Sequence, residues 1–440
     1  MSKRFACLLG IGILVVIGFL LACGTTYNSS SDGLLLVSSQ GSGLMESFSF
    51  SLANGHISSV SNPPSDTSNL TCVLKGLPAS VVIDPKGAFA YAIVLGDVPL
   101  CGSSSATGIQ AFKVNSNGTI AATGNLISDP SPVALAMDSS GKFLFVAEGV
   151  NSFPSTTNPP STTPCPGTTA QYGVCVYAIG SGATLTPVPG NFNFVQPNSQ
   201  TPNFVALAPT PTTLPGIGIN GVQNAVCSDP GNNPPTSEYL YVADSVNNVV
   251  WEFGVNTSTG VLTNPPGRSQ VWPFPAGTSG AVTSGVAVDP CDRFVYASNM
   301  QSNQIVGWTL CSVVTSTCPK ADGTLNPVPN SPFSLTGGAN GPGPLLVDPF
   351  GNYLYVLDTL SNQVSPFHIS SVSGSLTPGS VVVTGLQPTS IAIRADDSWL
   401  FVANFNAATL SEYSVTPATG VLSATPAVQT DNYPFGLAVK

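Results

Sequence analysis

Short apolar runs alternate with tight polar turns along the whole chain. In one copy, Pro344 to Val347 is an apolar run, Asp348 to Gly351 is a turn, and Tyr353 to Asp358 is a run of aromatic and β-branched residues. This order of residues predicts a β-hairpin. The pattern occurs in five further copies, at residues 80–94, 133–148, 285–299, 390–404 and, divided by an insert, at 204–209 with 238–244.

A seventh copy is divided between the two ends of the chain. Residues 434–440 match only the first run of the hairpin, and residues 33–39 match only the second. Pairing of these two halves would close a ring of repeats and leave no long sheet edge free. We therefore predict an all-β domain over residues 33–440, a seven-bladed β-propeller of four-stranded antiparallel blades, closed by pairing of its C-terminal strand with its N-terminal strands.

Composition agrees with many short strands and excludes some partners. Only 7% of the residues are charged, and the chain has 44 glycines and 40 prolines. This content suits turns, and the regular apolar runs argue against general disorder. The net charge of −10 disfavours nucleic acid, which needs a basic surface. We expect no nucleic-acid partner and a monomer.

The N-terminal segment has the features of an export signal. Lys3 and Arg4 precede an apolar run, and the sequence ending at Cys23 resembles the lipobox of bacterial lipoproteins. A plain signal peptide or a single membrane anchor is the alternative. We predict a signal peptide over residues 1–22, a lipid anchor on Cys23 and a flexible tether over residues 23–32. Gly24 favours the outer over the inner membrane of the cell envelope, so we place the protein outside the cytoplasm.

Eight cysteines remain after the two of the signal region, an even number that suggests disulfides in an exported protein. In a four-stranded blade with strands a to d from the axis outward, the a–b and c–d loops share one face of the ring. The b–c and d–a loops share the other face. Cysteines placed on a common face, or in one short loop, predict four bridges: Cys72–Cys101, Cys165–Cys175, Cys227–Cys291 and Cys311–Cys318. Metal binding is the rival interpretation, but no pair has CxxC spacing.

The second runs of the hairpins resemble a known family. The segments Tyr241 to Asp244, Phe145 to Glu148, Tyr355 to Asp358 and Phe401 to Asn404 are similar to the repeated YVTN element of seven-bladed lactonase-like propellers. That group includes the propeller-type 6-phosphogluconolactonases. The resemblance covers about residues 33 to 440, and it implies the propeller fold and, by family, a lactonase-type hydrolase.

Polar residues at the ends of the second runs are the candidate site. Glu148, Asp244 and Asp358 are candidate bases or metal ligands, and Ca²⁺ is the metal that such oxygen ligands suit. Asn299, Asn404 and Arg394 are candidate ligand-binding residues. The competing interpretation is that the Asp and Asn side chains cap turns and that Arg394 forms an ion pair.

No GxSxG, HExxH or Walker motif is present, and the two histidines lie in no catalytic pattern. The sequence therefore favours a surface module that binds a protein or carbohydrate through its b–c and d–a loops. The alternative is a hydrolase of a neutral lactone or sugar, including a 6-phosphogluconolactonase-like enzyme. Scattered basic residues make a poor site for a phosphorylated substrate.

Overall fold

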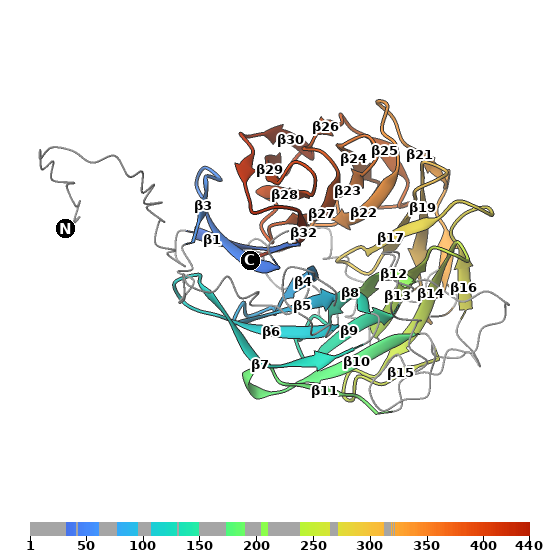
Figure 1. The fold of residues 1–440 in the computed structure, drawn as a ribbon. Helices are drawn as coiled ribbons and strands as arrows, with labels where there is room; N and C mark the ends of the chain where they lie inside the picture. The colour runs from blue at the N-terminus through green and yellow to red at the C-terminus, as the bar shows by residue number, and fades with distance from the viewer. Residues whose placement is uncertain are drawn as a thin grey trace, which may run out of the picture.

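The computed structural model describes twelve parts of the chain. They are residues 32–40, 43–60, 77–95, 107–129, 132–148, 173–189, 204–209, 238–264, 272–311, 318, 320 and 322–440. Within these parts the chain forms seven antiparallel sheets arranged in a ring (Figure 1). Among the described residues, no helix has the length and apolar character needed to cross a membrane.

Each sheet is one blade, and its strands a to d run from the centre of the ring outward. Blade 1 contains β32 (Pro434–Val439), β1 (Asp32–Ser39), β2 (Leu44–Ser51) and β3 (Ile57–Ser59). Blade 2 contains β4 (Leu77–Ile83), β5 (Phe89–Leu95), β6 (Gly108–Val114) and β7 (Ile120–Ser128). Blade 3 contains β8 (Pro132–Met137), β9 (Phe143–Glu148), β10 (Val174–Ile179) and β11 (Leu185–Pro187), with the short 3₁₀ helix η1 (Ser181–Ala183) between its last two strands.

Blades 4 to 7 have a fifth, short strand. Blade 4 contains β12 (Phe204–Pro209), β13 (Glu238–Asp244), β14 (Val249–Val255), β15 (Leu262–Thr263) and β16 (Trp272–Pro275). Blade 5 contains β17 (Thr283–Val288), β18 (Phe294–Asn299), β19 (Gln304–Leu310), β20 (Leu325–Pro327) and β21 (Phe333–Ser334). Blade 6 contains β22 (Pro342–Val347), β23 (Tyr353–Asp358), β24 (Gln363–Ile369), β25 (Leu376–Pro378) and β26 (Val382–Val383). Blade 7 contains β27 (Pro388–Ile393), β28 (Trp399–Asn404), β29 (Thr409–Thr416), β30 (Val421–Ala424) and β31 (Val428–Gln429).

The extra strands arise because the outer strand is divided. In blade 6, β25 and β26 both pair with β24, and Pro378 and Gly379 lie at the division. Proline has no N–H to donate to a strand ladder, so it interrupts the pairing. The predicted four-stranded blade therefore becomes a four- to five-stranded one.

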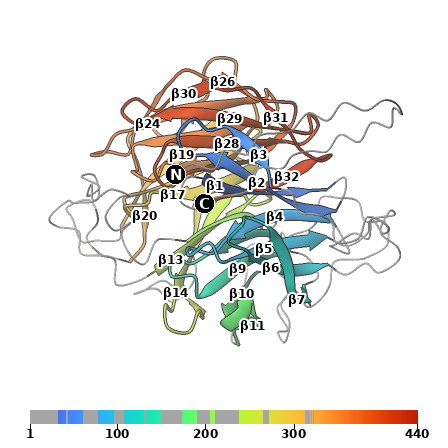
Figure 2. The same cartoon turned by 90° about the vertical axis from the view of Figure 1, so that its left-hand side faces the viewer.

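The ring is closed as predicted, by the two ends of the propeller. Strand β32 pairs antiparallel with β1, and Leu36 lies opposite Ala438. The first strands of neighbouring blades also contact each other around the centre, as β32 does with β4. Figure 2 shows the ring from its edge, with β1 and β2 of the first blade beside β4 and β5 of the second.

Apolar clusters fill the spaces between neighbouring blades. In strand β23, Tyr355 and Leu357 belong to the cluster between blades 6 and 7, whereas Leu354 and Val356 belong to the cluster between blades 5 and 6. Because successive side chains of a strand point to opposite faces, a strand b buried on both faces is apolar throughout. This explains why the second runs of the repeat are continuous rather than alternating.

In several blades, an aromatic side chain packs on a glycine of the next blade. Gly420 has a φ of +64°, and a Cβ there would lie 2.3 Å from the ring of Tyr353. The hydroxyl group of Tyr355 donates a hydrogen bond to the Gly420 carbonyl oxygen at 3.3 Å, and Tyr296 repeats this contact with Gly374 at 2.8 Å. These contacts fix the angle between adjacent blades, and they require glycine.

Candidate functional site

Five of the six predicted catalytic and ligand-binding residues end a strand b, and the sixth, Arg394, follows a strand a. Glu148, Asp244, Asn299, Asp358 and Asn404 are the last residues of β9, β13, β18, β23 and β28, and all are buried. Their shared position in the repeat places them at the same edge of their blades. Their hydrogen bonds differ. Side chains whose hydrogen bonds only join parts of the scaffold have a structural role, and the others are candidates for function.

Asp244 acts as a turn cap. Its Oδ1 accepts hydrogen bonds from the backbone N–H groups of Val246 and Asn247, at 3.1 and 3.2 Å. Its Oδ2 accepts hydrogen bonds from the Asn247 amide at 2.6 Å and from the Trp251 indole at 3.1 Å. Short acidic side chains stabilise turns in this way. The side chain therefore has a full structural role.

Asn299 and Asn404 connect strand b to the segment that enters their blade. The Asn404 side chain accepts a hydrogen bond from the Gly385 N–H at 3.1 Å and donates to Thr409 and Ser411. The Asn299 side chain accepts a hydrogen bond from the Thr283 hydroxyl and donates to the Ala276 carbonyl oxygen. Both amides thus join elements of the scaffold.

Asp358 is a buried acid with one partner. Its Oδ2 accepts a hydrogen bond from the Ser365 hydroxyl at 2.6 Å, and its Oδ1 has no hydrogen-bond partner in the described chain. Burial raises the pKa of this carboxyl to about 7, although the Ser365 bond opposes the shift. The group is thus partly protonated near neutral pH.

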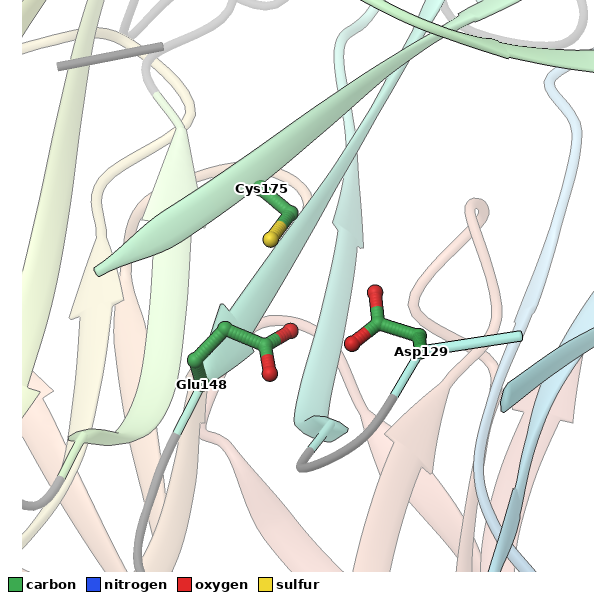
Figure 3. A group of neighbouring side chains, drawn as sticks. All are labelled: Asp129, Glu148 and Cys175. Atoms are coloured by element: carbon green, nitrogen blue, oxygen red, sulfur yellow. The ribbon is translucent and has the colours of Figure 1, made fainter. Parts of the chain in front are cut away.

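Glu148 lies in a cluster that joins blades 2 and 3 (Figure 3). One carboxylate oxygen of Glu148, one of Asp129 and the sulfur of Cys175 all lie within 4.8 Å of one another, and all three residues are buried. Asp129 follows β7, while Glu148 ends β9 and Cys175 lies in β10. The Tyr177 hydroxyl donates a 2.6 Å hydrogen bond to Oδ2 of Asp129. Burial, followed by repulsion from Asp129, raises the pKa of Tyr177, so its hydroxyl keeps its proton.

The donors of this cluster do not complete a cation site. Cys175 is disulfide-bonded, so its sulfur is no thiolate ligand. Acid–base chemistry by the carboxyl pair fits the described residues better than metal binding.

Arg394 forms an ion pair within its own turn. Its Nη1 lies 2.8 Å from Oδ2 of Asp396 and donates a 3.1 Å hydrogen bond to the Ser398 hydroxyl. The guanidinium carbon is 5.6 Å from the centre of the Phe50 ring. These contacts hold the side chain between blades 7 and 1.

One predicted disulfide is fully described. Cys311 and Cys318 are bonded, as predicted. Cys175 and Cys291 are also disulfide-bonded, and their predicted partners Cys165 and Cys227 lie outside the described residues. Cys72, Cys101 and the predicted lipidation residue Cys23 lie outside them as well.

The repeated motif marks Glu148 in the sequence, but it marks neither Asp129 nor Tyr177 as part of a site. Asp129 follows a strand d, which varies from blade to blade, so no repeated motif marks it. The one available signal was an acidic residue directly before the proline that precedes β8, in Ser128-Asp129-Pro130. Asp129 comes from blade 2 and Glu148 from blade 3, so only the packing of the two blades brings them together.

Comparisons with known proteins agree with the fold. The family model described as "Lactonase, 7-bladed beta-propeller" matches residues 310–435. A candidate 6-phosphogluconolactonase from Bacteroides fragilis has a similar structure, with a TM-score of 0.64, 17% identity, and coverage of 94% of this chain and 100% of that one. The periplasmic gluconolactonase of Pseudomonas aeruginosa also has a TM-score of 0.64, at 16% identity and coverage of 93% and 99%.

A search of curated proteins found no match. Identities of this size establish a shared fold and leave the activity open. The resemblance of the YVTN-like strands is nonetheless confirmed by the family model and by the solved structures. The chain is a seven-bladed β-propeller, and its residues 310–435 match the family model of the seven-bladed lactonase propellers.

Proposed function

We propose that this protein hydrolyses a neutral lactone and that Asp129 and Glu148 are its acid–base pair. The observation that carries the proposal is the approach of two buried carboxylates from different blades to within 4.8 Å. Two ionised carboxylates at this separation repel each other, so the pair favours holding one shared proton. A pair in that state offers both a base and an acid.

Lactone hydrolysis needs both functions. The ionised carboxylate removes a proton from a water molecule as the water attacks the lactone carbonyl carbon. The ring C–O bond of the tetrahedral intermediate then breaks, and the protonated carboxyl gives its proton to the leaving ring oxygen. The product is a hydroxy acid. The Tyr177 hydroxyl, bonded to Asp129, positions that carboxyl and remains protonated.

The charges of the described residues support a neutral substrate. Arg293 is paired with Asp289 at 2.6 Å, and Arg394 is paired with Asp396 at 2.8 Å. The chain has 11 basic residues in 440. A phosphorylated lactone would need several convergent cations, so an unphosphorylated sugar lactone fits better.

Steady-state hydrolysis of unphosphorylated aldonolactones by the purified chain tests the proposal. We expect Glu148→Gln and Asp129→Asn each to lower kcat by about 10²-fold or more, the usual contribution of a general base. Asp358→Asn is the matched control, because it removes a buried carboxylate from the same position in another blade. Equal activity of Glu148→Gln and the wild type would contradict the proposal, as would no hydrolysis of any lactone in the set.

The second candidate function is ligand binding without catalysis. Side chains of Leu360, Leu386 and Tyr433 are exposed in the b–c and d–a connections of blades 6, 7 and 1. The backbone N–H of Asn406 bonds to the Leu386 carbonyl oxygen, so these connections lie together on one face. A carbohydrate or protein partner recognised there would bind with unchanged affinity to Glu148→Gln, whereas the hydrolase proposal predicts slow turnover of a bound lactone.

A further inference from the structure

The a–b turns of the blades share one design. The first turn position is Asp84, Asp138, Asp289 or Asp348 in four blades and Arg394 in blade 7. The fourth position has a positive φ in every described turn, at Gly87, Gly141, Asp292, Gly351 and Asp397. Glycine tolerates this conformation best, so backbone conformation does not explain why blades 5 and 7 have Asp292 and Asp397 at this position.

The junction of blades 5 and 6 shows what the fourth position faces. A Cβ at Gly351 of blade 6 would lie 2.3 Å from Oδ1 of Asp289 in blade 5. Arg293, at the fifth position of the blade 5 turn, bonds both oxygens of Asp289, at 2.6 and 3.1 Å. Its Nη2 also donates to the Gly351 carbonyl oxygen at 2.7 Å. A cation therefore balances the buried carboxylate at this junction.

The junction of blades 6 and 7 lacks that cation and has a second carboxylate. Asn352 occupies the position that Arg293 has one blade earlier, and Asp397 occupies the position of Gly351. By the geometry of Gly351, Asp397 is directed toward Asp348. Burial is the main cause that raises the pKa of Asp397 to about 8, and repulsion from Asp348, followed by Asp396, adds to it, which agrees with a short distance between the two carboxyl groups. Arg394, the nearby cation, is bonded to Asp396 instead.

Both carboxyl groups are fully buried and incompletely bonded. Oδ1 of Asp348 accepts hydrogen bonds from the N–H groups of Asn352 and Tyr353, at 2.6 and 2.8 Å. Oδ2 of Asp348 and both oxygens of Asp397 have no hydrogen-bond partner in the described chain. Burying carboxylates without compensation is costly, so three such oxygens at one junction indicate a missing positive partner.

We propose that Asp348 and Asp397 bind a divalent cation of the Ca²⁺ class between blades 6 and 7. The cation occupies the role that the Arg293 guanidinium has between blades 5 and 6. Carboxylate oxygens are the ligands that hard cations prefer, and the three oxygens contribute part of the shell that Ca²⁺ requires. The site joins the a–b turns of two blades, and it is separate from the Asp129–Glu148 pair between blades 2 and 3.

Metal titration of the full chain tests the site. After treatment with chelator, we expect Ca²⁺ to raise Tm, because a ligand that binds only the folded state stabilises it. We also expect Tb³⁺, used as a Ca²⁺ probe, to luminesce on excitation of tyrosine, because Tyr355 is close enough for Asp397 and Asp348 to affect its pKa. Asp397→Gly should abolish both effects while retaining the turn, since blades 2, 3 and 6 have glycine at this position.

Two control variants distinguish this site from other carboxylates. Asp358→Asn removes a different buried acid of blade 6, and Asp129→Asn removes one of the proposed catalytic pair; both should retain the Ca²⁺ and Tb³⁺ responses. Loss of the responses in Asp129→Asn but not in Asp397→Gly would overturn the proposal. The proposal would also be overturned if the wild type showed no metal response and Asp397→Gly raised Tm at pH 8. Asp348 and Asp397 would then hold only a proton between them.

Discussion

The hydroxyl group of Tyr177 in blade 3 lies 2.6 Å from Oδ2 of Asp129, the residue that follows the last strand of blade 2. This hydrogen bond is buried and links two neighbouring blades through residues 48 positions apart. It also fixes one member of the proposed acid–base pair. The bond should therefore affect both stability and turnover.

Tyr177→Phe tests that bond. We expect a loss of about 1.5–3 kcal/mol in the free energy of unfolding, the range for a hydrogen bond to a charged group, measured by urea denaturation. We also expect a shifted pH profile of kcat, which a purely structural role would not produce.

Tyr91→Phe is the matched control, because the buried Tyr91 hydroxyl has no hydrogen-bond partner in the described chain. Its removal should leave the free energy of unfolding unchanged or slightly higher. Equal losses of unfolding free energy in the two variants would show that the Tyr177–Asp129 hydrogen bond does not stabilise the fold.

Stability should depend on pH through Asp358. Burial raises the pKa of Asp358 to about 7, so the folded state holds a proton that the unfolded state releases near pH 4. Stability is therefore full below the unfolded pKa and falls as the pH rises toward 7. We expect Asp358→Asn to reduce the loss between pH 5 and pH 8 by about 2 kcal/mol, measured from urea unfolding at both values. Parallel pH curves for variant and wild type would contradict this assignment.

Gly420→Ala should separate blades 6 and 7. The new Cβ would lie 2.3 Å from the Tyr353 ring, and the φ of +64° is itself unfavourable for alanine. We expect a loss of about 3 kcal/mol or more from strain and overpacking together, measured by thermal or urea unfolding.

Gly124→Ala supplies the comparison, since Gly124 has a φ of +68° but no atom within 4 Å of the added Cβ. It should lose only the backbone contribution of about 1–2 kcal/mol. Similar losses in both variants would mean that contact between the blades contributes little at Gly420.

Membrane attachment is tested by fractionation. We expect the full chain, expressed in a bacterium with an outer membrane, to fractionate with membranes and to carry lipid on Cys23 by mass spectrometry. Cys23→Ser should release it from the membrane fraction or leave the signal segment uncleaved. Recovery of the wild-type chain as an unmodified soluble protein would contradict the anchor.

The sequence predicted the ring because its evidence is local and repeated. The continuous apolar run from Tyr353 to Leu357 requires burial on both faces, which a strand b between two blades provides. The divided outer strands were not foreseen, because pieces as short as Val382–Val383 have no pattern of their own.

The candidate site was only half visible for a related reason. Glu148 could be identified because it ends a repeated motif, whereas Asp129 follows a strand d, which varies from blade to blade. Tyr177 lies at a strand c position that Tyr413 also occupies in blade 7, so the repeat does not set it apart. Their proximity depends on the packing of one blade against the next. The proximity of Asp348 and Asp397 also could not be predicted from the sequence. It is inferred by comparing the junction of blades 6 and 7 with the junction of blades 5 and 6, where Arg293 bonds Asp289.

The pairing of β1 with β32 also sets an order on folding. The hydrogen bond from the N–H of Gly436 to the Ser38 hydroxyl joins residues 398 positions apart, so nearly the whole propeller must be made before it can form. Until then Leu34 to Val37 belong to a strand with one unpaired, apolar edge. During synthesis, therefore, the chain exposes an unpaired, aggregation-prone strand until β32 is made. A chaperone that binds unpaired strand edges would act on this segment first.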